Sequence, residues 1–102
     1  MHACLILAIQ LEGCHITTIE GLAASGELDA LQKAFIDEIA IQCGFCTPGM
    51  ILSAKALLMK NPHPSRDEIC RALAGNLCRC SGYQQIISAI NKVAEEGLYE
   101  KL

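Results

Sequence analysis

Two short cysteine runs decide the fold of this chain: Cys43-Gly44-Phe45-Cys46 and Cys78-Arg79-Cys80. Four thiolates that arrive as two closely spaced pairs can close a tetrathiolate metal site. Each pair would come from one loop, and the chain between the two runs is long enough to supply two helices. The sequence therefore predicts a metal centre held between two loops of a helical domain.

The residues that follow each pair are typical of helix starts. Thr47-Pro48-Gly49 offers a capping hydroxyl and a proline suited to a first helical position, and Ser81-Gly82 can act similarly. Positive helix ends and free backbone N–H groups would then lower the thiol pKa values and stabilise a negatively charged cluster. A [2Fe–2S] centre with four thiolates carries about two negative charges oxidised and about three reduced, so these donors and Arg79 would favour the reduced form. That chemistry suits electron transfer.

Spacing alone leaves zinc open as the bound metal. Structural zinc sites usually pair C-x2-C with a second C-x2-C or with histidines, whereas the C-x-C run is tighter. Cys14 and Cys70 fit neither pair and are expected to be ordinary small hydrophobic residues. We expect no ligand among His2, His15 and His63, which lie in turn or terminal contexts.

The runs Ile41 to Met50 and Gly75 to Tyr83 resemble the iron–sulfur subunit, or domain, of a family of molybdenum hydroxylases. That family comprises xanthine dehydrogenase, aldehyde oxidoreductase and carbon monoxide dehydrogenase. Thr17 to Ala23 also resembles the linker between the family's two iron–sulfur domains, so the resemblance covers nearly all of the chain. It implies the C-terminal helical domain of the small subunit, with one [2Fe–2S] cluster close to the molybdopterin of a large partner subunit. FAD would be carried by a partner as well.

The resemblance also implies roles for individual residues. The implied cluster ligands are Cys43, Cys46, Cys78 and Cys80. The further residues expected at the cofactor are Gln42, Gly44, Phe45 and Arg79. Gln42 and the sulfur of Cys80 would lie against the pterin. Arg79, between two thiolates, would tune the cluster potential or meet the partner, while Phe45 and Tyr83 would seal the core or screen the cluster from water.

Length, composition and charge exclude several classes of protein. The chain has 102 residues, of which 52% are apolar, enough for one modest core. A net charge of −3 and eight scattered Lys and Arg residues give no footprint for nucleic acid or an anionic membrane. Seven cysteines, an odd number, argue against a secreted disulfide scaffold. Without a signal-like or membrane-length apolar run, we expect a cytoplasmic protein.

Residues 1–20 differ from the rest of the chain. Leu5 to Ile9 and Ile16 to Ile19 are short apolar runs separated by a turn-like break, which predicts a β-hairpin. Because an isolated hairpin is marginal in water, we interpret it as the remnant of a plant-type ferredoxin-like β domain. Cys4 resembles the last ligand of that domain's cluster, left as an orphan, and would then be a small buried thiol. We expect the chain to be a fragment of a longer protein.

Residues 21–102 are predicted to form a mainly α domain, a four-helix bundle of two longer and two shorter helices around the cluster. The first helix would begin at Ser25 or Gly26 and run toward Ala40. Its apolar stripe would be Leu28, Leu31, Phe35, Ile36 and Ile39, with Asp29 among its polar residues. A second helix would run from Pro48 to a stop near Asn61, a third would begin at a Ser65/Glu68 capping box, and a fourth would close around Glu96.

Three hypotheses about function follow from these patterns. The first is an electron-transfer module that passes electrons from a partner's molybdopterin centre through one [2Fe–2S] cluster toward a flavin or other acceptor. The second is a zinc-bound or metal-free structural module that only docks on a partner. The third is a remnant without function. No catalytic triad, paired carboxylates or phosphate loop is visible, so catalysis would belong to the partner.

Overall fold

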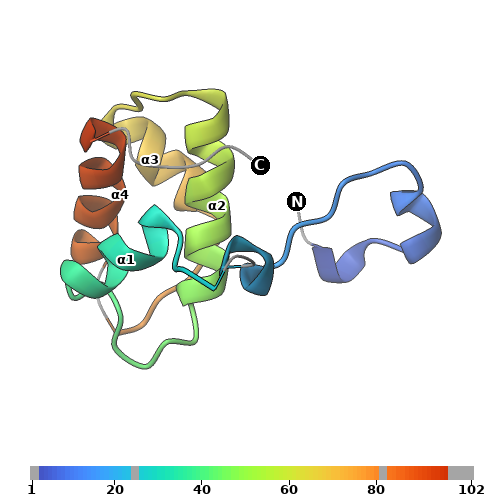
Figure 1. Ribbon diagram of the computed structural model, residues 1–102, viewed down its shortest axis with the longest axis horizontal. Helices are drawn as coiled ribbons and strands as arrows, with labels where there is room; N and C mark the ends of the chain where they lie inside the picture. The colour runs from blue at the N-terminus through green and yellow to red at the C-terminus, as the bar shows by residue number, and fades with distance from the viewer. Residues whose placement is uncertain (1–2, 24–25, 81–82, 97–102) are drawn as a thin grey trace.

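Helices make up the folded body of the protein. The computed structural model describes residues 3–23, 26–80 and 83–96. Its α-helices are α1 (Ala30–Asp37), α2 (Thr47–Lys60), α3 (Arg66–Leu73) and α4 (Gln84–Glu96). Short 3-10 helices precede them: η1 (Ala3–Leu5), η2 (Ala8–Leu11) and η3 (Ile19–Ala23). Figure 1 shows the four α-helices gathered into a bundle, two longer and two shorter, which confirms the predicted architecture.

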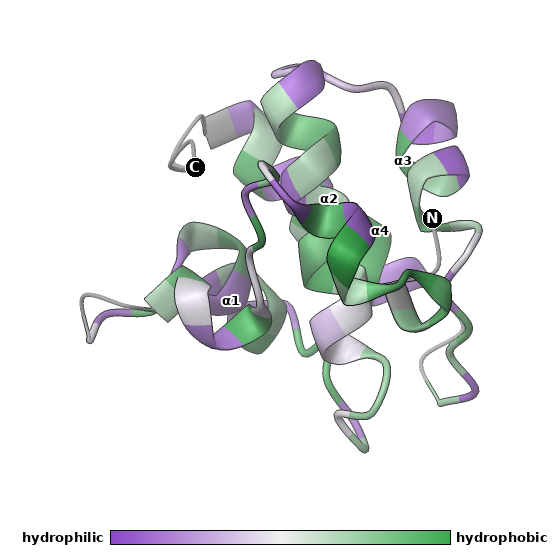
Figure 2. Ribbon diagram, turned by 90° about the vertical axis from the view of Figure 1, so that its right-hand side faces the viewer, coloured by the Kyte–Doolittle hydropathy of each residue, from purple (hydrophilic) through white to green (hydrophobic). Residues whose placement is uncertain are grey.

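The bundle is held by one apolar core. α1 packs mainly against α4, and α2 packs mainly against α3, so all four helices share the same interior. Figure 2 shows hydrophobic residues gathered where α2 and α4 lie together. The largest apolar side chains that are fully buried are Phe35, Leu31, Met50, Leu58, Ile69, Ile86 and Ile90. Burial of each stabilises the fold by about 1.5–3 kcal/mol before the loss of chain entropy is counted.

The predicted apolar stripe of the first helix is only partly correct. Leu31 and Phe35 are buried, whereas Leu28, Ile36 and Ile39 are exposed. The helix begins later than predicted because Asp29, and neither Ser25 nor Gly26, caps it: the Asp29 carboxylate accepts the N–H of Leu31. Ser25 itself lies outside the described residues. The helix is therefore short, and only a few of its side chains are buried in the core.

The other helix starts follow the sequence more closely. Ser65 and Glu68 form the predicted capping box, in which each side chain accepts the backbone N–H of the other residue. At the start of α2, however, the cap position belongs to Cys46 and not to the hydroxyl of Thr47, and no side chain caps that end. Pro48 occupies the first turn as expected. A cysteine thus stands directly at a helix N-terminus.

A buried ion pair joins α1 to α2. Lys55 Nζ lies 2.8 Å from Asp29 Oδ1, and both side chains are almost entirely buried. Asp29 was predicted on the polar face of its helix, yet it is enclosed because its carboxylate serves both the cap and Lys55. The capping aspartate therefore fixes the start of α1 against the middle of α2.

The first residues of the chain form an arm, residues 3–18, that leaves the bundle, as Figure 1 shows. The predicted β-hairpin is wrong for this structure: the described part of the arm contains η1, η2 and loops but no strand. Its exposed apolar side chains are Leu5, Leu7, Ile9 and Ile16. A hairpin needs further strands to cover its apolar face, and the bundle supplies none. Only η3, at the base of the arm, contacts α2.

Across the parts of the chain that the structure describes, none of the helices combines the length and the apolar character needed to cross a lipid bilayer.

The buried ion pair predicts a large loss of stability on removal of its cation. Lys55→Met keeps the volume of the side chain but leaves Asp29 buried and uncompensated, which should reduce the free energy of unfolding by about 3 kcal/mol. Urea unfolding followed by helical circular dichroism would measure the change.

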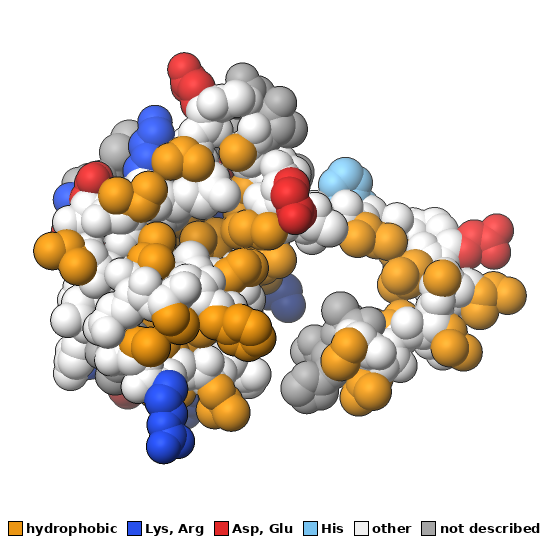
Figure 3. All heavy atoms as spheres, turned by 90° about the horizontal axis from the view of Figure 1, so that it is seen from below, with side chains coloured by type: hydrophobic (Ala, Val, Ile, Leu, Met, Phe, Trp, Pro, Cys, Tyr) orange, Lys and Arg blue, Asp and Glu red, His pale blue; other side chains and the backbone are white. Residues whose placement is uncertain are grey.

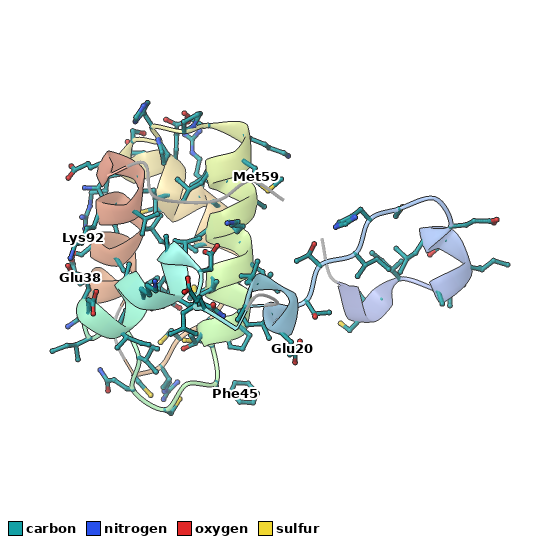
Figure 4. All side chains as sticks on the ribbon, in the orientation of Figure 1. Glu20, Glu38, Phe45, Met59 and Lys92 are labelled. Carbon is teal, nitrogen blue, oxygen red and sulfur yellow. The ribbon has the colours of Figure 1, made fainter. Side chains whose placement is uncertain are left out.

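A matched control is available on the surface. Lys92 Nζ lies 3.2 Å from Glu38 Oε1, and Figure 4 shows these two side chains together on the outside of the bundle. Since both are partly exposed, Lys92→Met should change the free energy of unfolding by less than about 1 kcal/mol. Equal unfolding midpoints for the two variants would contradict the assigned role of Lys55.

Candidate metal centre

Two loops at one end of the bundle bring the predicted ligands together. Cys43 and Cys46 lie in the loop before α2, and Cys78 and Cys80 lie in the loop between α3 and α4. They line a hollow of about 360 Å³ together with Phe45, Leu77, Arg79 and Tyr83. Figure 3 views the molecule from below and shows many side chains of the hydrophobic class, which includes cysteine, over this face of the bundle. The two cysteine runs, distant in sequence, thus face a common space.

The thiols approach one another in two pairs. The Cys43 thiol is hydrogen-bonded to that of Cys80, and the Cys46 thiol to that of Cys78. Each pair takes one cysteine from each loop. Among the described residues, no three His, Cys, Asp or Glu side chains converge in the way that a single metal ion needs. A two-iron cluster is different, because each iron takes two thiolates and bridging sulfides hold the pairs apart.

The first loop is shaped by backbone geometry around Gly44. Its φ of +85° lies in the left-handed region that favours glycine. This turn lets the N–H of Phe45 point at the sulfur of Cys43, which lowers the pKa of that thiol; the bond from the Cys80 thiol lowers it further. The same donor would stabilise a cluster thiolate. Gly44 therefore serves the loop conformation, and Gly44 and Gln42 are not among the residues that line the hollow.

Cys46 and Cys80 do not follow the prediction that helix starts lower thiol pKa values. Partial burial, followed by the bond to the Cys78 thiol, raises the pKa of Cys46 to about 11. The pKa of Cys80 is raised chiefly because its thiol bonds to Cys43. Neighbouring thiolates repel one another, which also contributes to the raised pKa values of Cys46 and Cys80. Cations bound between the sulfurs would replace the thiol protons.

The second loop is tied to the helix that follows the first. Asn76 Nδ2 donates to Ser53 Oγ of α2 at 2.8 Å. Gly49, in the first turn of α2, makes room for this contact: a Cβ at Gly49 would lie 2.6 Å from Asn76 Oδ1. The sequence analysis missed this contact, because a glycine near a helix start is adequately explained by capping. An asparagine two residues before a ligand cysteine was the available signal.

The remaining predicted site residues are distributed unevenly. Arg79 lines the hollow as expected, and Gln42 is exposed beside Cys43. Phe45 does not seal the core: its side chain is 93% exposed, and Figure 4 shows it projecting away from the helices. Leu77, which the sequence analysis did not single out, is 86% exposed on the same rim. Tyr83 does pack against the core.

Cysteines outside the two pairs are not buried, contrary to expectation. Cys4, Cys14 and Cys70 are all exposed. Cys4 and Cys14 lie on the arm, which lacks a core of its own, and Cys70 lies on the outer side of α3. His15 and His63 are exposed as well, and His2 lies outside the described residues.

Comparison with known proteins identifies the family of the chain. Residues 18–91 match the protein family described as the [2Fe–2S] binding domain. The chain belongs to this family. The domain is 51% identical, over 90% of this chain, to the nicotinate dehydrogenase small FeS subunit of Eubacterium barkeri. It is 48% identical, over 86% of this chain, to the xanthine dehydrogenase iron–sulfur-binding subunit of Escherichia coli O157:H7. The chain spans 59% and 57% of the lengths of these relatives.

Solved structures show the same domain. Quinoline 2-oxidoreductase from Pseudomonas putida 86 matches 96% of this chain with a TM-score of 0.84 and 50% identity, over 64% of its own chain. The aldehyde oxidoreductase from Desulfovibrio gigas matches 97% of this chain with a TM-score of 0.79 and 36% identity, over 12% of its own chain. The predicted resemblance and the predicted [2Fe–2S] cofactor are confirmed.

The contact between the second loop and α2 predicts an unusual response to alanine at Gly49. Helix propensity alone favours alanine by about 1 kcal/mol. The new Cβ would displace Asn76 and break its bond to Ser53, so Gly49→Ala should instead lower the free energy of unfolding by about 1 kcal/mol. Gly75→Ala is the control, because a Cβ there meets nothing within 4 Å. A Gly49→Ala variant at least as stable as the unsubstituted chain would contradict this account.

The thiol pKa values predict an order of alkylation. In the reduced, metal-free chain near pH 8, iodoacetamide should modify Cys43 before Cys80 and Cys46 last of these three cysteines, because only the thiolate reacts. A pKa of about 11 leaves roughly one Cys46 thiol in a thousand ionised at that pH. Raising the pH by one unit should therefore speed modification of Cys46 about tenfold. Peptide mass spectrometry would report the order, and equal rates at Cys43, Cys46 and Cys80 would refute it.

Proposed function

We propose that this domain transfers electrons through one [2Fe–2S] cluster held by Cys43, Cys46, Cys78 and Cys80. The observation that carries the proposal is the pairing of thiols across the two loops, one from each loop in each pair. Each iron would take one such pair. When bound, the cluster supplies one-electron chemistry, and the chain positions it and sets its potential through N–H donors such as that of Phe45.

We further propose that the electrons come from a molybdopterin centre on a larger partner subunit and leave toward a flavin or another acceptor. The names of the relatives support the assignment to an assembly, since they are small or iron–sulfur-binding subunits. Cys43 and Cys80 are exposed, and their thiols contact each other. Transfer would run through this pair, where Gln42 adjoins Cys43 and would lie against the pterin.

The rim of the hollow suits contact with such a partner. Phe45 and Leu77 are exposed apolar side chains on this rim, and Arg79 adds a positive charge between two of the proposed ligands. Large exposed apolar side chains around a functional centre are typical of protein interfaces. Their burial by a partner would also exclude water from the cluster. The domain division, with residues 1–20 belonging to a ferredoxin-like neighbour and residues 21–102 to this one, stays a prediction.

Anaerobic reconstitution of the full chain with iron and sulfide tests the proposal. We expect about two irons and two sulfides per chain, and an electron paramagnetic resonance signal after reduction with dithionite. Cys43→Ser and Cys80→Ser should each abolish or strongly reduce cluster uptake. Cys70→Ser, at an exposed cysteine outside both pairs, should leave it unchanged. Stoichiometric zinc without sulfide would instead indicate the structural alternative, and full cluster content in both serine variants would refute the ligand assignment.

A further inference from the structure

Tyr83 begins α4 in a strained conformation. Its φ is +73°, in the left-handed region that a tyrosine rarely adopts, at a cost of about 1–2 kcal/mol. Its carbonyl accepts the N–H of Ile87 at 3.0 Å, which places Tyr83 at the first position before the helix. A residue with this strain persists only where its side chain is held by other contacts.

Those contacts lead to a predicted ligand. The hydroxyl oxygen of Tyr83 accepts the backbone N–H of Cys78 at 2.9 Å. The half-buried ring packs against the apolar core and lines the hollow that the four loop cysteines share. It also lines a second hollow, of about 310 Å³, behind the loop, together with Leu77 and Cys70. The tyrosine therefore stands between the two hollows and supports the loop that carries Cys78.

Packing alone does not explain why Tyr83 carries a hydroxyl group at this place. A phenylalanine ring would fill the same space and face the same core. The oxygen adds one specific interaction, a hydrogen bond from the half-buried amide of Cys78, and the loss of such a bond costs about 1–3 kcal/mol. This amide belongs to the residue whose thiol meets Cys46. Fixing the amide fixes the direction in which the Cys78 side chain leaves the backbone.

We propose that Tyr83 is a positioning residue for the cluster: its hydroxyl anchors the Cys78 amide and thereby sets the geometry of the Cys46–Cys78 pair. This inference rests on the proposed function of the four cysteines. It assigns to Tyr83 no electron or proton transfer of its own.

Tyr83→Phe removes only the hydroxyl, and Ser88→Ala, which removes an exposed hydroxyl from the same helix, is the matched control. After anaerobic reconstitution of the full chains, we expect iron release to a chelator to be about tenfold faster in Tyr83→Phe and unchanged in the control. The shape of the reduced electron paramagnetic resonance signal should also change, because it depends on how the thiolates are arranged around the irons. Helical circular dichroism should be unchanged.

The electron paramagnetic resonance spectrum distinguishes a role in positioning the thiolates from a general contribution to the stability of the domain. A Tyr83→Phe signal identical to that of the unsubstituted chain overturns the proposal, whatever the release rate. A folded variant that takes up no cluster supports it.

A measurement on the unsubstituted, metal-free chain covers the case in which the variant fails to fold. Hydrogen exchange at the Cys78 amide should be at least about tenfold slower than in an unprotected peptide, and an unprotected rate overturns the proposal. Failure of the unsubstituted chain to bind iron and sulfide would contradict the proposed function and not the Tyr83 contact, which the exchange rate still decides.

Discussion

The closeness of the two cysteine loops depends on the N-terminal end of α2. Cys46 is the cap residue directly before that helix. Asn76 of the second loop donates a hydrogen bond to Ser53 of the same helix, and Gly49 leaves space for the Asn76 side chain. Further along, Lys55 of the same helix is bonded to Asp29 at the start of α1. One helix therefore connects the first ligand pair, the second loop and the core. Any change that displaces α2 should therefore also displace the sulfur atoms of the loop cysteines.

Contacts between thiols show how four cysteines fit into a small space. Burial and the bond to the Cys78 thiol raise the pKa of Cys46, and the bond to the Cys43 thiol raises the pKa of Cys80, so these two thiols hold their protons at neutral pH. Iron bound by the thiolates would replace such protons, and the N–H of Phe45 would stabilise the thiolate of Cys43. Repulsion between the thiolates would therefore arise only when the cluster binds, and the positive charge of the irons would offset it.

Local patterns in the sequence predicted the helices and the ligand loops because their signals are local: cysteine spacing, the Ser65 capping box and apolar periodicity. The start of α1 has a local signal too, the capping box of Asp29 and Gln32, which the predicted start at Ser25 or Gly26 overlooked. The burial of Asp29 against Lys55, a residue distant in sequence, could not be read locally. The hairpin prediction failed because short apolar runs form strands only when neighbours cover them. The Asn76 and Tyr83 contacts join segments whose relative positions exist only after folding.

The exposure of Cys43 and Cys80 has a consequence for the lifetime of the centre. As proposed ligands open to solvent, these two sulfurs are within reach of oxygen and peroxide, which oxidise thiolates through sulfenic acid and beyond. A bare domain should therefore lose its iron in air faster than one whose rim is covered. Assembly would then act as protection against oxidative damage, and the surviving population of clusters would be biased toward molecules that had already found a partner.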